Sequence, residues 1–308
     1  MLTTNPSRFL ISRIIQFNAF GSSLTTLSSH LSGPGSSKED TKFKQDIETS
    51  SGVWILPSYI NHSCTGNCRR SFIGDMQIIR STCDMPANTE LFFPYLSLPT
   101  QKTSYEDRQK ELQSWKFTCS CDICEYTKNA DKKLVKKREE LNSDLERAFG
   151  RKEKIDHRKL DTAKIERLLG AMENCYKGMN GKNIPKIAIW ERYLAMTRVY
   201  AMLGQTQKVV WGVAKTLEML LFEVSGLMRP KEPLVMGKWG LVTDYLVECW
   251  LLLCTSYVIL GQGEKAEVAK DLAIVSYRII VGEDETFEEV YGSKAKNYIA
   301  EGMLWNGL

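Results

Sequence analysis

Polar side chains that could bind a metal or a ligand gather in the segment NHSCTGNC at residues 61–68. It holds His62, one of three histidines in 308 residues, together with Cys64 and Cys68, two of the nine cysteines. Apolar, strand-like runs flank the segment, so these side chains are expected where strands end and functional residues commonly gather. Imidazole and thiolate groups bind zinc in proteins. The alternative is a turn in which these residue types occur by chance.

A second group of cysteines has the spacing C-x-C-x-x-C, at Cys119, Cys121 and Cys124. Three cysteines within six residues, separated by serine and aspartate, are hard to explain as core packing, whereas such spacings suit tetrahedral zinc. Three ligands leave one position open, and spacing alone allows either Cys64 or Cys68 to fill it. A closed four-sulfur site would be structural, not catalytic. The competing interpretation is a set of inert or redox-active cysteines.

The composition is that of an ordinary globular chain, with 43% hydrophobic and 25% charged residues over a length that allows two domains. A formal net charge of +4 is too small to mark a nucleic-acid-binding surface, so no direct nucleic-acid partner is expected. The longest apolar run, residues 249–260, is too short to span a bilayer, and no membrane association is expected.

The cysteine count and the N-terminus bear on the compartment. Nine cysteines is an odd number in a long chain without a visible secretory signal, which favours a reducing compartment, the nucleus and/or the cytoplasm. Residues 1–38 contain arginine, many serines and threonines, and no acidic residue, which is also the composition of a mitochondrial presequence. The mitochondrion is therefore the alternative location.

The first part of the chain is β-rich. Residues 21–51 are rich in Ser, Thr, Gly and Lys and are expected to form a loop or an insertion. Short apolar runs bounded by turn residues then predict four strands, at 53–56, 71–73, 76–80 and 90–93. The two middle strands are separated by Gly74-Asp75, which predicts a tight hairpin.

The rest of the chain is expected to be helical, which makes the fold class α+β. Residues 104–116 predict an amphipathic helix with Ser104 as its N-cap. A second helix is predicted within the charged stretch 128–154, because four apolar residues recur there at helical spacing: Leu134, Leu141, Leu145 and Phe149.

An internal repeat lies in the C-terminal part. The hexapeptide YAMLGQ at 200–205 recurs as YVILGQ at 257–262, an offset of 57 residues. A helix that ends in glycine and is followed by a second helix is the pattern of helix-pair repeats. Residues 165–308 are therefore predicted to form stacked helix pairs similar to tetratricopeptide repeats, with a plain helical bundle as the alternative.

Three elements follow one another in order: NHSC at 61–64, NTELFFPY at 88–95 and FTCSCDIC at 117–124. Together they resemble the C-terminal half of the SET domain of protein lysine methyltransferases and its post-SET motif, whose usual patterns are NHSCxPN, GEELxxxY, and an aromatic residue followed by CxCxxC. SET-and-MYND (SMYD) and fungal SET proteins, in which a TPR-like region follows post-SET, look most similar. The resemblance implies a partial β-rich SET fold with a post-SET zinc site, followed by an all-α TPR-like helical domain.

The same resemblance implies S-adenosylmethionine-dependent methylation of protein lysine, with histone lysine as one candidate substrate. Tyr95 matches the motif tyrosine that orients the amine and is the catalytic residue implied. Asn61 and His62 match the pair that binds the cofactor. Phe117 matches the aromatic that packs on the adenine, and Asn18, in an Asn-x-Phe segment, would lie near the cofactor.

The remaining roles also come from the resemblance. Phe20, in the same Asn-x-Phe segment, would line the lysine channel together with Tyr95. Cys64 would complete a structural zinc site with the three cysteines of the C-x-C-x-x-C segment, Cys119, Cys121 and Cys124. The implied cofactors are S-adenosylmethionine and zinc, and the implied partners are a protein substrate and proteins that bind the helical repeats.

The implied domains are a partial SET domain at 1–98, a post-SET segment at 99–126, a charged helical linker at 127–164 and the TPR-like domain at 165–308. Gly66 stands where the family has proline, and Asn88-Thr89 replaces the usual Gly-Glu. No Gly-x-Gly strand precedes Ile14 and no MYND cluster is present, so an N-terminally truncated SET domain is expected. The alternative function is a catalytically inactive SET remnant that acts as a protein-interaction scaffold through its helices.

Overall fold

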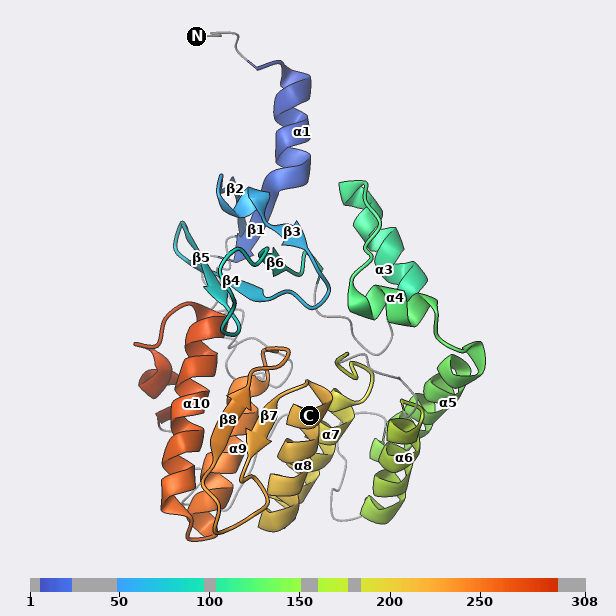
Figure 1. Ribbon diagram of the computed structural model, residues 1–308, viewed down its shortest axis with the longest axis vertical. Helices are drawn as coiled ribbons and strands as arrows, with labels where there is room; N and C mark the ends of the chain where they lie inside the picture. Colours follow the sequence, from blue (N-terminus) through green and yellow to red (C-terminus); the bar gives the residue numbers. More distant parts are fainter. Residues whose placement is uncertain (1–5, 24–48, 97–103, 151–159, 177–183, 293–308) are drawn as a thin grey trace.

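The computed structural model describes residues 6–23, 49–96, 104–150, 160–176 and 184–292. The described chain mixes strands and helices, as the sequence predicted. A small strand-rich part lies at one end of a larger helical part, and α3 and α4 lie beside the strands (Figure 1). None of the helices in the described ranges is long and apolar enough to cross a membrane.

Within the described residues, the strand-rich part consists of three separate two-stranded sheets. Two pairs are antiparallel: β1 (Ala19–Ser23) with β2 (Thr49–Val53), and β4 (Cys68–Ile73) with β5 (Met76–Ser81). The third pair is parallel and joins β3 (Asn61–His62) to β6 (Phe92–Phe93). This short parallel pair positions the candidate site, because it places His62 beside Phe93, two residues before Tyr95.

The strand predictions are confirmed only in part. The hairpin at Gly74-Asp75 is confirmed, since Ile73 pairs with Met76 across it. A strand at 53–56 was wrong: β2 ends at Val53, and a 3-10 turn, η2 (Pro57–Tyr59), follows because proline fixes a turn-like φ and removes an N–H donor. The run at 90–93 forms a strand only at Phe92–Phe93. Most of the expected loop at 21–51 lies outside the described residues, and a loop was wrong for its two ends, because residues 21–23 and 49–51 pair with each other as parts of β1 and β2.

A helix that the sequence did not predict, α1 (Arg8–Asn18), precedes β1. Ser7 caps it by accepting a hydrogen bond from the Leu10 N–H. The helix projects away from the other elements (Figure 1), and none of its residues is buried.

The predicted helix at 104–116 is present as α3 (Tyr105–Leu112), followed by a 3-10 turn, η3 (Gln113–Trp115). Ser104 is its N-cap, as predicted, and forms a capping box with Asp107. Lys116 ends the element with a left-handed φ of 59°. The chain therefore reverses before the C-x-C-x-x-C segment, which leads into α4 (Asp122–Lys128).

The helical part shares one large apolar core. Its helices are α5 (Lys132–Phe149), α6 (Thr162–Asn174), α7 (Trp190–Met202), α8 (Thr206–Met219), α9 (Leu246–Ile259) and α10 (Gly263–Val281), with a π-helical turn, η5, at Glu288–Gly292. The predicted stripe on α5 is largely confirmed: Leu141 and Leu145 are buried in this core and Phe149 packs against it, whereas Leu134 is 40% exposed.

The internal repeat marks two equivalent helix–turn–helix corners, α7–α8 and α9–α10. Gly204 and Gly261 have φ values of +66° and +70°, a left-handed conformation that glycine adopts without strain. In each corner the residue after the glycine donates its N–H to the carbonyl of the repeat tyrosine, at 2.9 Å for Tyr200 and 2.8 Å for Tyr257. Two helix pairs are thus present, and their likeness to tetratricopeptide repeats stays a prediction.

The prediction of helices alone in this part was wrong. An antiparallel hairpin of β7 (Glu223–Ser225) and β8 (Val235–Lys238) lies between the two helix pairs. Its loop is held by the buried ammonium group of Lys265, which donates to the Gly226 carbonyl at 2.6 Å and the Arg229 carbonyl at 2.7 Å. The inserted hairpin lengthens the repeat offset beyond the ~34 residues of tetratricopeptide repeats.

The β4–β5 hairpin connects the two parts of the molecule, since it lies against one end of α10 (Figure 1). Arg69 forms an ion pair with Asp244, and Arg80 donates to the Gly282 carbonyl at 2.9 Å. The outward face of β4 is therefore fixed to the helical part. Its inward face contributes to a small aromatic core of Phe20, Phe72 and Phe93.

Candidate functional site

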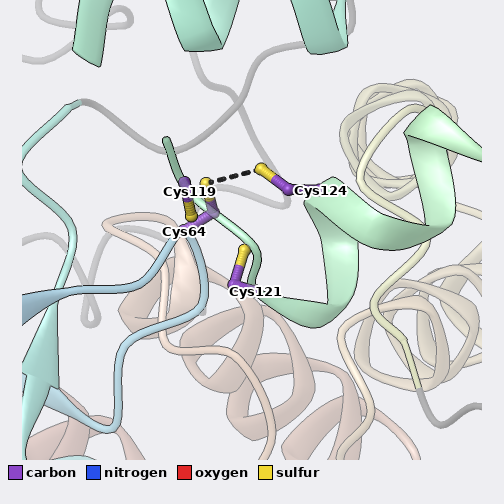
Figure 2. Close-up of side chains that lie close together, drawn as sticks. All are labelled: Cys64, Cys119, Cys121 and Cys124. Atoms are coloured by element: carbon purple, nitrogen blue, oxygen red, sulfur yellow. Dashed lines mark hydrogen bonds between the residues drawn. The ribbon is translucent and has the colours of Figure 1, made fainter. Parts of the chain in front are cut away.

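Four cysteine sulfurs converge from two distant segments (Figure 2). Cys64 lies in the loop after β3, while Cys119, Cys121 and Cys124 come from the segment that leads into α4. All four Sγ atoms lie within 4.8 Å of one another, and those of Cys64 and Cys124 are 3.6 Å apart. Cys68 is buried on β4 and is not part of the group. The structure thus decides between the two candidates in favour of Cys64.

The arrangement fits a zinc ion in its donor set and its size. Ligands at a Zn–S distance of ~2.3 Å in a tetrahedron have sulfurs ~3.8 Å apart, close to the separations here. Three of the four cysteines are buried, as expected for a closed structural site. The cluster could hold zinc, and the metal would then join the strand-rich part to α3 and α4.

Helix α3 supports this cluster through side chains that the sequence did not single out. The Gln109 amide accepts from the Cys119 N–H at 2.9 Å and donates to the Cys119 carbonyl at 3.2 Å, and its nitrogen lies 3.4 Å from the Cys124 sulfur. The buried guanidinium of Arg108 lies 3.9 Å from the same sulfur. Hydrogen bonds of this kind orient metal ligands, and the positive charge offsets the net negative charge of a four-thiolate site.

The four thiols cannot all ionise easily without a cation. Hydrogen bonding with Cys119 raises the pKa of Cys64, whereas hydrogen bonding with Cys121 lowers the pKa of Cys119. The pKa values are driven apart because a thiolate that accepts a hydrogen bond is stabilised, whereas the thiol that donates it keeps its proton. A divalent cation would remove the conflict by allowing each sulfur to bind as a thiolate.

His62 connects the cysteine cluster to Tyr95. Its Nδ1 accepts a hydrogen bond from the Tyr95 backbone N–H at 2.9 Å, so the proton of the neutral ring is on Nε2. Nε2 lies 3.5 Å from the Cys64 sulfur, to which it can donate. One side chain therefore contacts both a cluster sulfur and the backbone of the predicted catalytic residue.

Strand β6, which ends two residues before Tyr95, passes very close to the loop that carries Cys64. A Cβ atom at Gly66 would lie 2.5 Å from the Phe92 oxygen and 2.6 Å from the Phe93 Cα, so no larger residue fits. Asn67 fixes the same strand: it accepts from the Phe92 N–H and donates to the Glu90 carbonyl, both at 2.8 Å. Close approach of the backbone therefore requires glycine at position 66.

The ring of Tyr95 is surrounded by the rings of four other residues. Its ring centroid is 5.2 Å from that of His62, 5.6 Å from Phe93, 5.4 Å from Trp115 and 6.2 Å from Phe117. Its hydroxyl donates to the Ile60 carbonyl at 2.8 Å. Burial raises the pKa of the phenol although Arg70 lowers it, so Tyr95 remains neutral at physiological pH and acts as a donor, not as a base.

The other predicted site residues are only partly brought together. Phe117 lies 5.8 Å from the His62 ring, and the exposed Asn61 amide donates to the Glu90 carboxylate at 2.9 Å. Phe20 is buried and lies 6.0 Å from the Phe93 ring, so it reaches Tyr95 through that phenylalanine. Asn18 does not join the group, because its amide donates to the Ile14 carbonyl within α1.

The site thus contains residues that the sequence did not point to. Asn67 could have been found from the sequence, since the NHSCxPN pattern ends in asparagine. Trp115, Gln109 and Arg108 had none, because their partners lie elsewhere in the sequence and only the reversal after α3 brings them together.

Comparison with known proteins agrees with these motifs. The SET domain profile matches residues 22–96, a range that contains β2 to β6 and Tyr95. A "Methyltransferase" of Gibberella zeae is 35% identical over 294 residues, which are 93% of this chain and 39% of that protein.

Two animal proteins are also similar. Histone-lysine N-methyltransferase SMYD3 of Mus musculus is 25% identical over 195 residues, covering 62% of this chain and 44% of that protein. Protein-lysine N-trimethyltransferase SMYD5 of Gallus gallus is 35% identical over 77 residues, covering 24% of this chain and 18% of that protein. The chain spans less than half the length of each of these three relatives.

Proposed function

We propose that this chain, a SET-domain homologue of the SMYD proteins and of a fungal methyltransferase, belongs to a protein-lysine N-methyltransferase that uses S-adenosylmethionine. The observation that carries the proposal is the position of Tyr95: its ring lies against His62 and Phe117, and its backbone is held by His62. The three residues come from separate motifs of the sequence and meet at one point.

The residues present fit the cofactor. Phe117 offers an aromatic face for an adenine ring next to His62, and the exposed amide of Asn61, the neighbour of His62 on β3, would bind the polar methionine part. S-adenosylmethionine, when bound, supplies an activated methyl group for in-line transfer. The protein's part is to orient the lysine amine and to exclude water from it.

Tyr95 would orient the amine and Phe20 would line the approach to it. A lysine amine attacks only in its neutral form, although its ordinary pKa is ~10.4. Aromatic walls disfavour the ammonium form by desolvation, so the site needs no strong base. The neutral phenol of Tyr95 agrees with this, because it donates a hydrogen bond and takes no proton.

Zinc in the four-cysteine cluster would have a structural task. Bound there, it would hold the segment of Phe117 next to the loop of His62 and thereby order the pocket. The supporting observations are the sulfur separations and the Nε2 contact of His62 with the Cys64 sulfur.

The Tyr95→Phe variant tests the catalytic role. The phenylalanine ring keeps the stacking contacts but loses the hydroxyl, so methyl transfer should fall by about 100-fold or more while S-adenosylmethionine affinity stays within about threefold. Transfer of labelled methyl groups to core histones and to a lysine peptide library measures the rate, and calorimetry measures the affinity. Tyr59→Phe, at a 78% exposed tyrosine, is the matched control. Equal transfer by Tyr95→Phe and the native protein would exclude the role of Tyr95.

A second candidate function rests on the helical part. The two helix corners repeat the same hydrogen bond from a glutamine N–H to a tyrosine carbonyl, and their helices share a large core, which suits a surface that binds proteins. A scaffold without catalysis would show no heat of binding with millimolar S-adenosylmethionine, whereas the methyltransferase would bind it. The same calorimetric titration therefore separates the two functions.

A further inference from the structure

An arginine side chain enters the small aromatic core from β4. Side chains alternate between the two faces of a strand, so Arg70 shares a face with Cys68 and Phe72, both buried. Arg69, on the other face, pairs with Asp244. Arg70 thus points in the direction of the apolar core, where a charged residue needs an explanation.

The guanidinium of Arg70 lies against two aromatic rings. Its Cζ atom is 5.3 Å from the centroid of Phe20 and 5.2 Å from that of Phe93, and these rings are 6.0 Å apart. Both distances lie within the ~6 Å range of cation–π attraction. No ion pair to Arg70 occurs within the described residues, so the rings are the main attraction seen for this charge.

The rings of Phe20 and Phe93 form an aromatic position, occupied by the Arg70 guanidinium, that adjoins Tyr95. The Phe93 ring lies 5.6 Å from the Tyr95 ring, and the charge of Arg70 acts on the phenol. Phe20 is the residue expected to line the approach of the substrate amine, and Tyr95 the residue expected to orient it. The guanidinium is therefore in contact with the walls that a lysine side chain would use.

We propose that Arg70 is a specificity-determining residue whose guanidinium occupies the aromatic position beside Tyr95, and that a substrate amine gains full access to Phe20 and Phe93 by displacing it. The proposal rests on the proposed function, because that function makes these rings the lysine channel. The guanidinium and a substrate amine cannot occupy the same ring faces at once, so Arg70 weakens the binding of any amine that must compete with it. It thereby favours substrates with further contacts outside the channel.

Substitution of Arg70 should reveal the competition. Arg70→Met keeps an unbranched side chain and removes the charge. We expect the Kd of Nα-acetyl-lysine methylamide to fall about tenfold in this variant. Arg70→Lys retains a cation that can cover the same rings, and its Kd should stay within about threefold of the native value. Arg69→Met, which loses the same charge from the same strand, is the control and should leave the Kd unchanged.

The binding measurement uses the 308-residue chain without cofactor and follows the tyrosine ring signals by NMR. In the native protein the Arg70 side-chain protons should show ring-current shifts that disappear as the amine is added, a readout that needs no variant. Ring-current shifts that persist at saturating amine would overturn the proposal. So would an Arg70→Met variant, folded by circular dichroism, that binds the amine no more tightly than the native chain.

The two proposals fail separately. If no variant binds S-adenosylmethionine in calorimetry, the methyltransferase proposal fails, while amine displacement of Arg70 still supports occupation of the aromatic position. If S-adenosylmethionine binds and Arg70→Met has the native amine affinity, the methyltransferase proposal stands and the role of Arg70 is wrong.

Discussion

Replacement of His62 by alanine should weaken zinc binding and also destabilise the segment of Tyr95, because one imidazole contacts both the Cys64 sulfur and the Tyr95 backbone. A hydrogen bond to a charged group contributes ~1.5–3 kcal/mol, which corresponds to a loss of zinc affinity of about 10- to 100-fold. The Tyr95 N–H would lose its acceptor at the same time, at a cost of ~1–3 kcal/mol in the free energy of unfolding.

Competition with a chromophoric chelator measures the zinc affinity of His62→Ala, and urea unfolding with zinc present measures its stability. Asn61→Ala is the matched control, since Asn61 is the neighbouring residue on β3, is exposed, and bonds to Glu90 instead of a cysteine. It should lower cofactor affinity and leave zinc affinity unchanged. A His62→Ala variant with native zinc affinity would show that the Nε2 contact does not act on the metal site.

Three further predictions concern the cysteine cluster, the loop at Gly66 and the stability of the protein at acidic pH. Cys121→Ser should bind zinc at least ~100-fold more weakly, whereas Cys68→Ser should keep one ion per chain by metal analysis; equal zinc content in both variants would reject the ligand set. Gly66→Ala should lose ~1–3 kcal/mol in urea unfolding, because its Cβ would lie 2.5 Å from a carbonyl oxygen, and Gly21→Ala, with open space around it, should lose almost nothing. Burial raises the pKa of Glu173, but hydrogen bonds from a tyrosine and a lysine outweigh it, so the pKa lies below its ordinary 4.5. The stability from this carboxylate is therefore present above that pH and lost as the pH falls below it, and Glu173→Gln should flatten this acid dependence in thermal melts; an unchanged slope would contradict it.

The sequence predicted the cysteine cluster because three cysteines at such short spacing suit tetrahedral zinc far better than they suit core packing. It could not choose between Cys64 and Cys68 from spacing, since both lie within one short segment of the sequence and the choice depends on which sulfur faces the C-x-C-x-x-C segment. The resemblance chose Cys64, and the structure agrees, because Cys68 is already within β4 and buried there.

Prediction failed where a long-range contact decided the local structure. The run at 53–56 has strand-forming residues, yet Trp54 turns toward the β4–β5 hairpin, packs on Phe72 at 5.3 Å and donates to the Asp75 carbonyl. The hairpin of β7 and β8 is short, and its most decisive support, Lys265, lies well beyond it in the sequence, on α10. Neither contact is visible in local patterns.

Arg70 is a further residue whose role could not be predicted from the local sequence. In the sequence it is the second of two adjacent arginines just before a predicted strand, and nothing distinguishes it from Arg69. The alternation of the strand separates them: one reaches Asp244 on the helical part, and the other reaches the rings of Phe20 and Phe93.

The position of Tyr95 depends on several weak elements acting together. The sheets of the strand-rich part have only two strands each, and isolated pairs of this kind are marginally stable. What holds them near Tyr95 is a set of contacts between separate segments: the His62 ring, the Asn67 amide and the Arg70 guanidinium. Because each contact joins segments far apart in sequence, loss of the metal at one end would be felt at the tyrosine. A structural ion and a catalytic side chain would in this way be parts of one cooperative unit.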